Sequence, residues 1–179
     1  MRKCLIGAVL LTATPLAWSQ VGPRETALAR ISRARSIAED AEVLGAVRAR
    51  NANPDTMAEI QRKDKEWMGN PQAPLRKALT QNACAQRLRE LTKDDPLIVE
   101  VILMDAQGAN VCVSKETSDY WQGDEAKFHK TFGDGKEAFV DDPAFDTSAN
   151  VYALQLSVLV RDGGKKIGAL TLSLRVPKQ

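Results

Sequence analysis

The stretch VYALQLSVLVRDGGKKIGALTLSLRV, residues 151–176, decides the fold. It contains two runs rich in aliphatic residues, separated by the tight connection Asp162 to Gly164. A short connection that contains glycine suits the pairing of antiparallel strands. We therefore predict a β-hairpin formed by residues 151–161 and 166–176.

The two faces of this hairpin differ in chemistry, because successive side chains of a strand point to opposite sides. One face carries large aliphatic side chains, at Leu154, Leu156, Val158, Val160, Leu170, Leu172, Leu174 and Val176. The other carries small or polar side chains, at Ala153, Gln155, Ser157, Ala169, Thr171 and Ser173. We expect helices to cover the aliphatic face. The polar face either lines a ligand cavity beneath a lid, for which the segment from Tyr120 to Phe139 is the candidate, or faces water.

The amino-terminal part of the chain is predicted to be one long helix. No proline interrupts residues 25–50, and apolar residues recur there every three or four positions, at Leu28, Ile31, Ala34, Ile37, Ala41, Leu44 and Val47. This spacing is typical of an amphipathic helix. We assign the long helix to residues 20–53.

Two further helices are expected before the first strand. Asn53 and Pro54 form a capping and first-turn pair, so the second helix is predicted to begin there and to end at Gly69. The third is predicted to begin near Pro74 and to end at the break formed by residues 93–96. Its apolar stripe includes Leu75, Leu79, Cys84, Leu88 and Leu91, which places Cys84 on the packed side.

The remaining segments complete an α+β domain. The apolar run 97–104 and the short run 111–113 predict a hairpin, and a helical stretch over residues 124–132 precedes a short strand near 138–140. Helices followed by five strands favour a five-stranded antiparallel sheet with the long helix packed on one side. We assign residues 54–179 to this single domain.

The first residues have the features of an export signal. Arg2 and Lys3 precede the apolar run 5–13, and small residues follow at Ala17 and Ser19. This order predicts a signal peptide over residues 1–19, with cleavage after Ser19 and a periplasmic product. The apolar run is shorter than the roughly 20 residues that cross a bilayer, so we expect no membrane span after cleavage.

Two cysteines remain after this cleavage, Cys84 and Cys112. In an oxidising compartment such a pair usually forms a bridge, so we expect a disulfide. Two buried thiols are the alternative, because the sequence does not show whether the two Cβ atoms lie close enough to bond.

Charge and motifs argue against several classes of protein. The formal net charge is only +2, with interspersed signs, which gives no support for nucleic-acid binding. His129 is the only histidine, and no zinc motif or glycine-flanked nucleophilic serine accompanies it. The acidic groups between Asp134 and Asp146 do not follow the helix-loop-helix calcium pattern. We therefore expect no enzyme, no metal site and no cofactor.

A resemblance narrows the functional class. The string TSDYWQGDEAKF at residues 117–128, the preceding VILMDAQGAN at 101–110, the block FVDDPAFD at 139–146 and the closing strand resemble a Cache domain of the PDC group, a PAS-like extracytoplasmic sensor. The resemblance covers about residues 60–176. In that family a small ligand, often a carboxylate or an amine, lies between the sheet and the loops on its far side.

The resemblance implies a periplasmic module that binds a small carboxylate, amino acid or amine. Most members of the family are parts of chemoreceptors and histidine kinases, so a membrane protein of one of these kinds is the expected signalling partner. This chain shows no signalling module of its own. The ligand would have to be presented to that separate partner.

Three candidate ligand-binding residues lie in the TSDYWQGDEAKF string. Tyr120 and Trp121 combine a flat apolar body with a polar group, which suits them to cover and orient a small ligand. Their alternative role is to plug the end of the sheet. Lys127 could neutralise a ligand carboxylate, or it could be a solvated helix lysine.

Three more candidates come from the sheet and its neighbouring turn. Gln155 and Ser157 offer donors and acceptors on the polar face. Asp141 could bind an amino group, although Asp141, Asp142 and Asp146 could instead shape a turn around Pro143.

A second functional hypothesis is an interaction module without a ligand. The near-heptad spacing of the long helix would then serve to form a homodimer or to dock on a receptor. A helix packed on its own sheet requires a similar stripe, so the spacing alone does not decide between the two.

Overall fold

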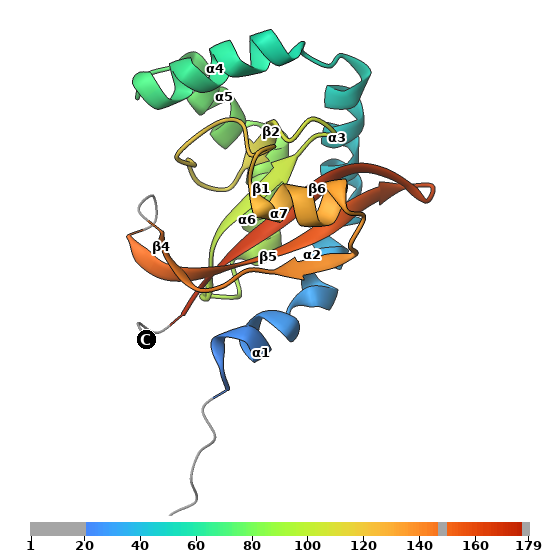
Figure 1. Ribbon diagram of the computed structural model, residues 1–179, viewed down its shortest axis with the longest axis vertical. Helices are drawn as coiled ribbons and strands as arrows, with labels where there is room; N and C mark the ends of the chain where they lie inside the picture. The colour runs from blue at the N-terminus through green and yellow to red at the C-terminus, as the bar shows by residue number, and fades with distance from the viewer. Residues whose placement is uncertain (1–20, 147–149, 177–179) are drawn as a thin grey trace, which may run out of the picture.

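The computed structural model describes residues 21–146 and 150–176. The predicted signal peptide and its cleavage site after Ser19 lie outside the described residues. Within them, helices precede an antiparallel sheet, and a short helical insertion lies between the strands (Figure 1). The α+β class predicted from the sequence is confirmed.

The described part of the sheet has one strand more than predicted. Its strands are β1 (Ile98–Met104), β2 (Asn110–Val113), β3 (Ala138–Val140), β4 (Ala144–Asp146), β5 (Val151–Asp162) and β6 (Lys165–Arg175). They follow the order β2-β1-β6-β5-β3, and β4 also pairs with β5. The additional strand β4 is three residues long and follows Pro143, so its sequence carries little periodic signal.

The hairpin of β5 and β6 is the centre of the sheet. Its pairing extends from Ala153 opposite Arg175 to Asp162 opposite Lys165. At the turn, Gly163 and Gly164 have φ values of 54° and 83°. Two successive positive φ values match the twist of the flanking strands, and glycine adopts them without a steric penalty.

Helices cover the aliphatic face of this hairpin, as predicted. They are α1 (Pro23–Leu28), α2 (Ile31–Ala38), α3 (Ala41–Ala52) and α6 (Ala83–Thr92). All the large aliphatic positions of the hairpin join one buried cluster with residues of these helices, among them Ile37, Val47 and Leu88. Full burial of such a side chain contributes about 1.5–3 kcal/mol, so this cluster is the main source of stability.

The prediction of one long amino-terminal helix over residues 20–53 is wrong in detail, because three shorter helices occupy this segment. The side chain of Asp40 accepts hydrogen bonds from the backbone N–H groups of Glu42 and Val43, and so caps the start of α3. Asp is a favoured capping residue. A straight helix of 26 residues would extend about 39 Å, whereas the three segments change direction to follow the sheet (Figure 1).

The predicted bounds of the next two helices are also wrong, because capping residues start the helices at other positions. Helix α4 (Met57–Gly69) begins after Thr56 rather than at Asn53, since Thr56 and Glu59 form a capping box. The predicted third helix is divided into α5 (Pro74–Gln81) and α6, because Asn82 caps α6 by accepting a hydrogen bond from the N–H of Ala85. Leu75 and Leu79 of α5 pack against a different apolar cluster from Cys84 and Leu88 of α6, a division that the periodicity did not reveal.

The predicted disulfide is present. It joins Cys84 on α6 to Cys112 on β2, with 6.0 Å between the Cα atoms. Both residues belong to the aliphatic core. On the chain-entropy model, a bridge closing a loop of this length stabilises the fold by about 3.5 kcal/mol.

The opposite face of the sheet is covered only in part by a second apolar cluster. Ile102 and Met104 of β1 and Ala169 of β6 pack there against Phe128 of α7 (Ala126–Phe128) and against residues of α4. The π-helix η1 (His129–Gly133) continues α7, as the predicted helical stretch requires. Figure 1 shows α7 in front of the sheet and α6 behind it. Among the described residues of this face, Glu100, Gln155 and Ser173 belong to neither apolar cluster.

Candidate ligand-binding site

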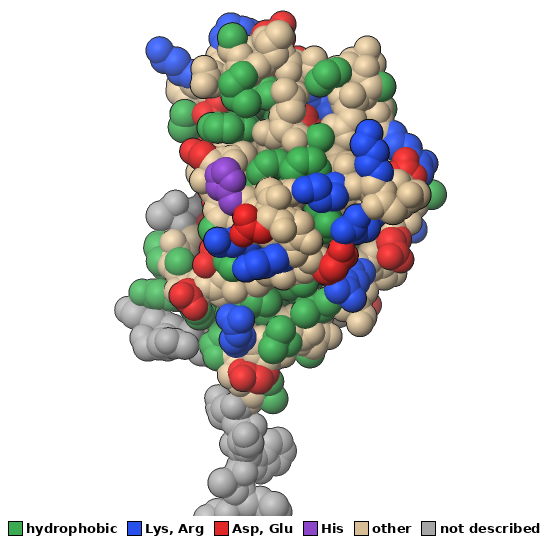
Figure 2. Space-filling model, turned by 45° about the vertical axis from the view of Figure 1, so that its right-hand side comes forward, with side chains coloured by type: hydrophobic (Ala, Val, Ile, Leu, Met, Phe, Trp, Pro, Cys, Tyr) green, Lys and Arg blue, Asp and Glu red, His purple; other side chains and the backbone are tan. Residues whose placement is uncertain are grey.

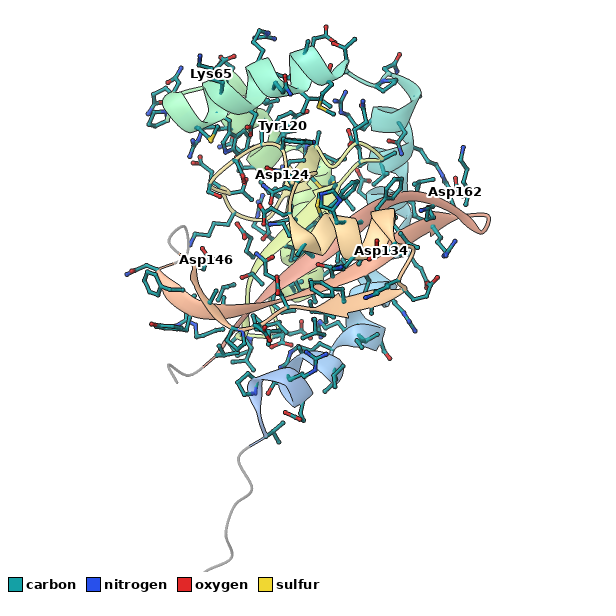
Figure 3. The ribbon with its side chains drawn as sticks, in the orientation of Figure 1. Lys65, Tyr120, Asp124, Asp134, Asp146 and Asp162 are labelled. Carbon is teal, nitrogen blue, oxygen red and sulfur yellow. A yellow bond between two sulfur atoms is a disulfide. The ribbon has the colours of Figure 1, made fainter. Side chains whose placement is uncertain are left out.

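A cavity of about 310 Å³ lies on the polar face of the sheet. Its floor comes from the strand residues Glu100, Ile102, Ala153, Gln155 and Ser173. One wall comes from Thr117, Ser118, Gln122, Glu125 and Lys127, and the other from Asp141, Asp142, Ala144, Phe145 and Asp146. Asp146, labelled in Figure 3, ends β4 at one side of the cavity. Such a volume is at the lower end of the range for small-molecule pockets.

The strand register brings the polar residues of the floor together. Glu100 of β1 lies opposite Ser173 of β6, and Ser173 lies opposite Gln155 of β5. Directly opposite residues on neighbouring strands point to the same face. Three strands therefore place these three polar side chains in one row.

Glu100 is the most unusual residue of the floor. It is only 3% exposed, and its Oε1 atom has no hydrogen-bond partner among the described residues. The pKa of this carboxyl is raised to about 8, chiefly by burial and also by the nearby charge of Asp146, while Lys127 acts in the opposite direction. The sequence analysis missed Glu100, although it is the only charged residue in the apolar run 97–104.

Lys127 lines the cavity but is already paired. Its side chain is 3% exposed, and its Nζ atom lies 2.8 Å from Oε2 of Glu125. The other charged residues that line the cavity are all acidic: Glu100, Glu125, Asp141, Asp142 and Asp146. Lys127 is therefore not the solvated lysine of the alternative interpretation, and the cavity is strongly acidic.

Asp141 and Gln155 both line the cavity, and the backbone couples them. The backbone N–H of Asp141 donates to the carbonyl of Gln155 at 2.9 Å. The carboxylate of Asp141 accepts the backbone N–H of Asp142 at 2.9 Å. Asp141 thus shapes the local turn and faces the cavity at the same time, which combines the two roles considered for it.

Tyr120 and Trp121 do not line this cavity, contrary to the prediction that they cover a ligand. Tyr120 is 2% exposed, its ring centroid lies 6.1 Å from that of Trp67, and its hydroxyl accepts a hydrogen bond from Arg50 at 3.3 Å. Burial raises its pKa to about 12. The indole N–H of Trp121 donates to the carbonyl of Gln107 at 2.9 Å. Both residues close the end of the sheet, because their polar atoms have partners within the protein.

Ser157 also lies outside the cavity. It is fully buried, and its hydroxyl shares a hydrogen bond of 2.8 Å with that of Thr171 on the neighbouring strand. Helix α7 and η1 pack over this part of β5. The polar face is thus divided into a sealed part at Ser157 and a hollow part at Gln155.

The wall formed by residues 117–127 is held by contacts from distant parts of the chain. The carboxylate of Asp64 on α4 accepts the backbone N–H groups of both Tyr120 and Trp121 at 2.9 Å. The side-chain amide of Asn110 on β2 donates to the carbonyl of Asp119 at 3.1 Å. These bonds explain where the TSDYWQGDEAKF string contributes: its aromatic residues anchor the wall, and its polar residues face the cavity.

No group of three or more histidine, cysteine or acidic side chains that could hold a metal ion occurs within residues 21–146 and 150–176.

Comparisons with known proteins support the fold. No protein-family model matches the sequence, and no curated protein sequence matches it either. Among solved structures, the extracellular domain of a protein described as a histidine kinase, vpHK1S-Z8, is similar with a TM-score of 0.51 at 7% identity, over 86% of this chain and 53% of that one. The chain has the fold of Cache-type extracytoplasmic sensor domains.

Two further sensor domains are similar at lower scores. That of E. coli DcuS gives a TM-score of 0.49 at 14% identity, over 86% of this chain and 90% of that one. That of the V. cholerae histidine kinase DctB gives 0.46 at 12% identity, over 85% and 54%. This Cache fold therefore spans about half the length of the vpHK1S-Z8 and DctB domains, and most of the DcuS domain.

Within residues 21–146 and 150–176, no helix has both the length and the apolar character needed to cross a membrane.

Proposed function

We propose that this protein is a periplasmic ligand-binding domain of the sensor type, which holds a small carboxylate, amino acid or amine in the cavity on the polar face of its sheet. The observation that carries the proposal is the cavity itself. Its floor contains polar side chains from three adjacent strands, on the side of the sheet where the Cache resemblance places the ligand. A membrane histidine kinase or chemoreceptor is the proposed partner that receives the signal.

The disulfide and the predicted signal peptide support the periplasmic location. A bridge between Cys84 and Cys112 is favoured in an oxidising compartment. Export through residues 1–19 would bring the chain to such a compartment.

Binding rather than catalysis is proposed for the cavity. His129, the single histidine of the sequence, is exposed on η1 and does not line the cavity. Figure 2 shows it in purple on a surface where acidic and basic side chains alternate. Because a general base must lie within hydrogen-bond reach of the reacting group, His129 is poorly placed to act on a ligand held by Gln155.

The structure weakens the support for the alternative hypothesis of an interaction module. Apolar residues of the amino-terminal segment, including Ala34, Ile37 and Val47, are buried against the sheet of the same chain. The stripe that suggested a helix pairing with a second copy is thus already occupied within the fold.

A thermal-shift screen tests the proposal. Protein purified under denaturing conditions and refolded, so that no ligand is carried over, is heated with amines, amino acids and carboxylates. A ligand at 100 times its Kd stabilises the native state by about 2.7 kcal/mol, which is readily detected. Gln155→Ala in the floor should reduce the shift, whereas the exposed Gln86→Ala should not. Failure of every compound to shift the transition would refute the proposal.

A further inference from the structure

We infer that the cavity binds a small organic cation, an amine or diamine whose ammonium group contacts the carboxylate of Glu100. This inference rests on the proposed function and selects one of its ligand classes. It assigns to Glu100 the central role in recognition.

Glu100 is a buried residue with an unpartnered carboxyl oxygen among the described residues. Only 3% of the residue is exposed, and its Oε1 atom lacks a hydrogen-bond donor among the described residues. A buried carboxyl without a partner is costly to the fold unless something compensates it. Since Glu100 lines the cavity, an ammonium group in the cavity would supply the missing donor in a charge-assisted hydrogen bond.

Several donors around the cavity already have partners within the protein. Lys127 donates to Glu125 at 2.8 Å, and the side-chain amide of Gln122 donates to the carbonyl of Asp119 at 3.1 Å. The hydroxyl of Ser173 donates to Asp146 at 3.4 Å. These three donors are directed to oxygen atoms of the protein, while the Oε1 atom of Glu100 is left to accept from a ligand.

Acidic side chains outnumber basic ones around the cavity. Lys127 stands as the one basic side chain among the described lining residues, against acidic side chains on the floor and on both walls. A ligand carboxylate at Lys127 would meet repulsion from Glu125, which is already paired there, and from Asp141. A cation is attracted by the same groups, and charge complementarity of this kind selects between ligands of opposite sign.

Size and donor geometry favour an organic cation over a metal ion. The cavity measures about 310 Å³, which is roughly ten times the volume of one water molecule in the liquid. The described residues contain no cluster of three or more acidic, histidine or cysteine side chains that could hold a metal ion. An alkylamine can fill such a space while it presents its ammonium group to one carboxylate.

Binding of a cation should release a proton. The pKa of Glu100 is raised to about 8, chiefly by burial. Asp146 and Asp119 also raise it, Lys127 and Lys115 lower it, and Glu125, Asp141 and Asp142 share the cavity with it. At pH 7 the free cavity therefore holds Glu100 mostly protonated, and an ammonium ligand favours the ionised form. The affinity for an amine should rise by about 25-fold from pH 6.5 to 8.5, as the ionised fraction increases.

Titration calorimetry of the purified protein tests the inference with two probes of equal chain length and opposite charge, 1,4-diaminobutane and succinate. A series of monoamines, diamines, amino acids and carboxylates of two to six carbons extends the comparison. We expect binding of an amine and none of its carboxylate counterpart. In two buffers of different ionisation enthalpy, the observed heat at pH 7 should differ by the amount that proton release predicts.

Glu100→Gln is the decisive variant. Asp124→Asn is its control, since Asp124 is an exposed acid next to Glu125 of the cavity wall and does not itself line the cavity (Figure 3). Glu100→Gln should weaken amine binding by about 30-fold at pH 8.5, the loss expected for a charge-assisted hydrogen bond, and should remove the pH dependence. Asp124→Asn should change neither. Proton release by the unmodified protein does not depend on how any variant folds.

The possible contrary results separate the two proposals. If carboxylates bind and amines do not, the inference is overturned and the proposed function stands. Equal amine affinity in Glu100→Gln, or binding without proton release, overturns the role of Glu100 alone. If no compound of either charge binds, the proposed function fails and the inference fails with it.

Discussion

The two faces of the central hairpin illustrate how one strand pair serves two purposes. On the face covered by α1, α2, α3 and α6, large aliphatic side chains form a closed core. On the other face, Ser157 and Thr171 are sealed together while Gln155 and Ser173 border a cavity. The difference shows that alternation assigns each residue to a face, whereas the covering segments decide whether that face is filled.

The largest expected effect separates the two faces at adjacent positions of β6. Leu172→Ala on the aliphatic face should reduce the free energy of unfolding by about 2–5 kcal/mol, because the side chain is fully buried and leaves a cavity. Ser173→Ala on the cavity floor should cost less than about 1 kcal/mol, since it removes one long hydrogen bond. Urea denaturation of both variants measures this. Equal losses would contradict the distinction between the faces.

A smaller effect concerns the pH dependence of stability that Glu100 imposes. Its pKa rises from an ordinary value near 4.5 to about 8 on folding, so the native state binds more protons than the unfolded state between these values. Stability should therefore fall as the pH rises, by about 2 kcal/mol between pH 6 and pH 8.

The difference between the unmodified protein and Glu100→Gln isolates this contribution, because other groups titrate in both. Urea denaturation at several pH values, in the absence of ligand, provides the measurement. The interpretation of Glu100 as an unpaired buried acid would be wrong if the two proteins lost stability in parallel.

The smallest expected effect concerns Tyr120, which is buried outside the cavity. Tyr120→Phe removes a hydroxyl that accepts a hydrogen bond from Arg50 but does not reach the cavity. We expect a loss of at most about 1 kcal/mol in stability and no change in ligand affinity. Calorimetry with whichever ligand the screen identifies checks the second point, and a weakened affinity would restore Tyr120 to the site.

The candidate site was predictable in part. Lys127, Asp141 and Gln155 line the cavity, and each was accessible from the resemblance or from the alternation of β5. Tyr120 was misplaced because an aromatic side chain suits a ligand cover and a core plug equally well. Glu100 was overlooked because a charged residue in an apolar run reveals its burial only when the neighbouring strands and loops are in place.

The amino-terminal helices were also predictable only in part from the sequence. The apolar spacing of residues 25–50 correctly placed Ala34, Ile37 and Val47 against the sheet, whereas Leu28 and Ala41 are exposed. It could not reveal that Asp40 begins a new helix, because a capping bond competes with helix continuation over only a few residues. The outcome depends on tertiary contacts such as the ion pair between Asp40 and Arg87 on α6.

The sequence by itself determined the strands other than β4, the chemistry of the two faces of the central hairpin and the α+β class, because side-chain alternation and turn glycines act over a few neighbouring residues. Only the tertiary structure decided which polar positions stay accessible to a ligand. The wall over them is held by bonds such as those from Tyr120 and Trp121 to Asp64, which lies 56 residues from Tyr120 along the chain. Local patterns carry no information about contacts between residues so far apart.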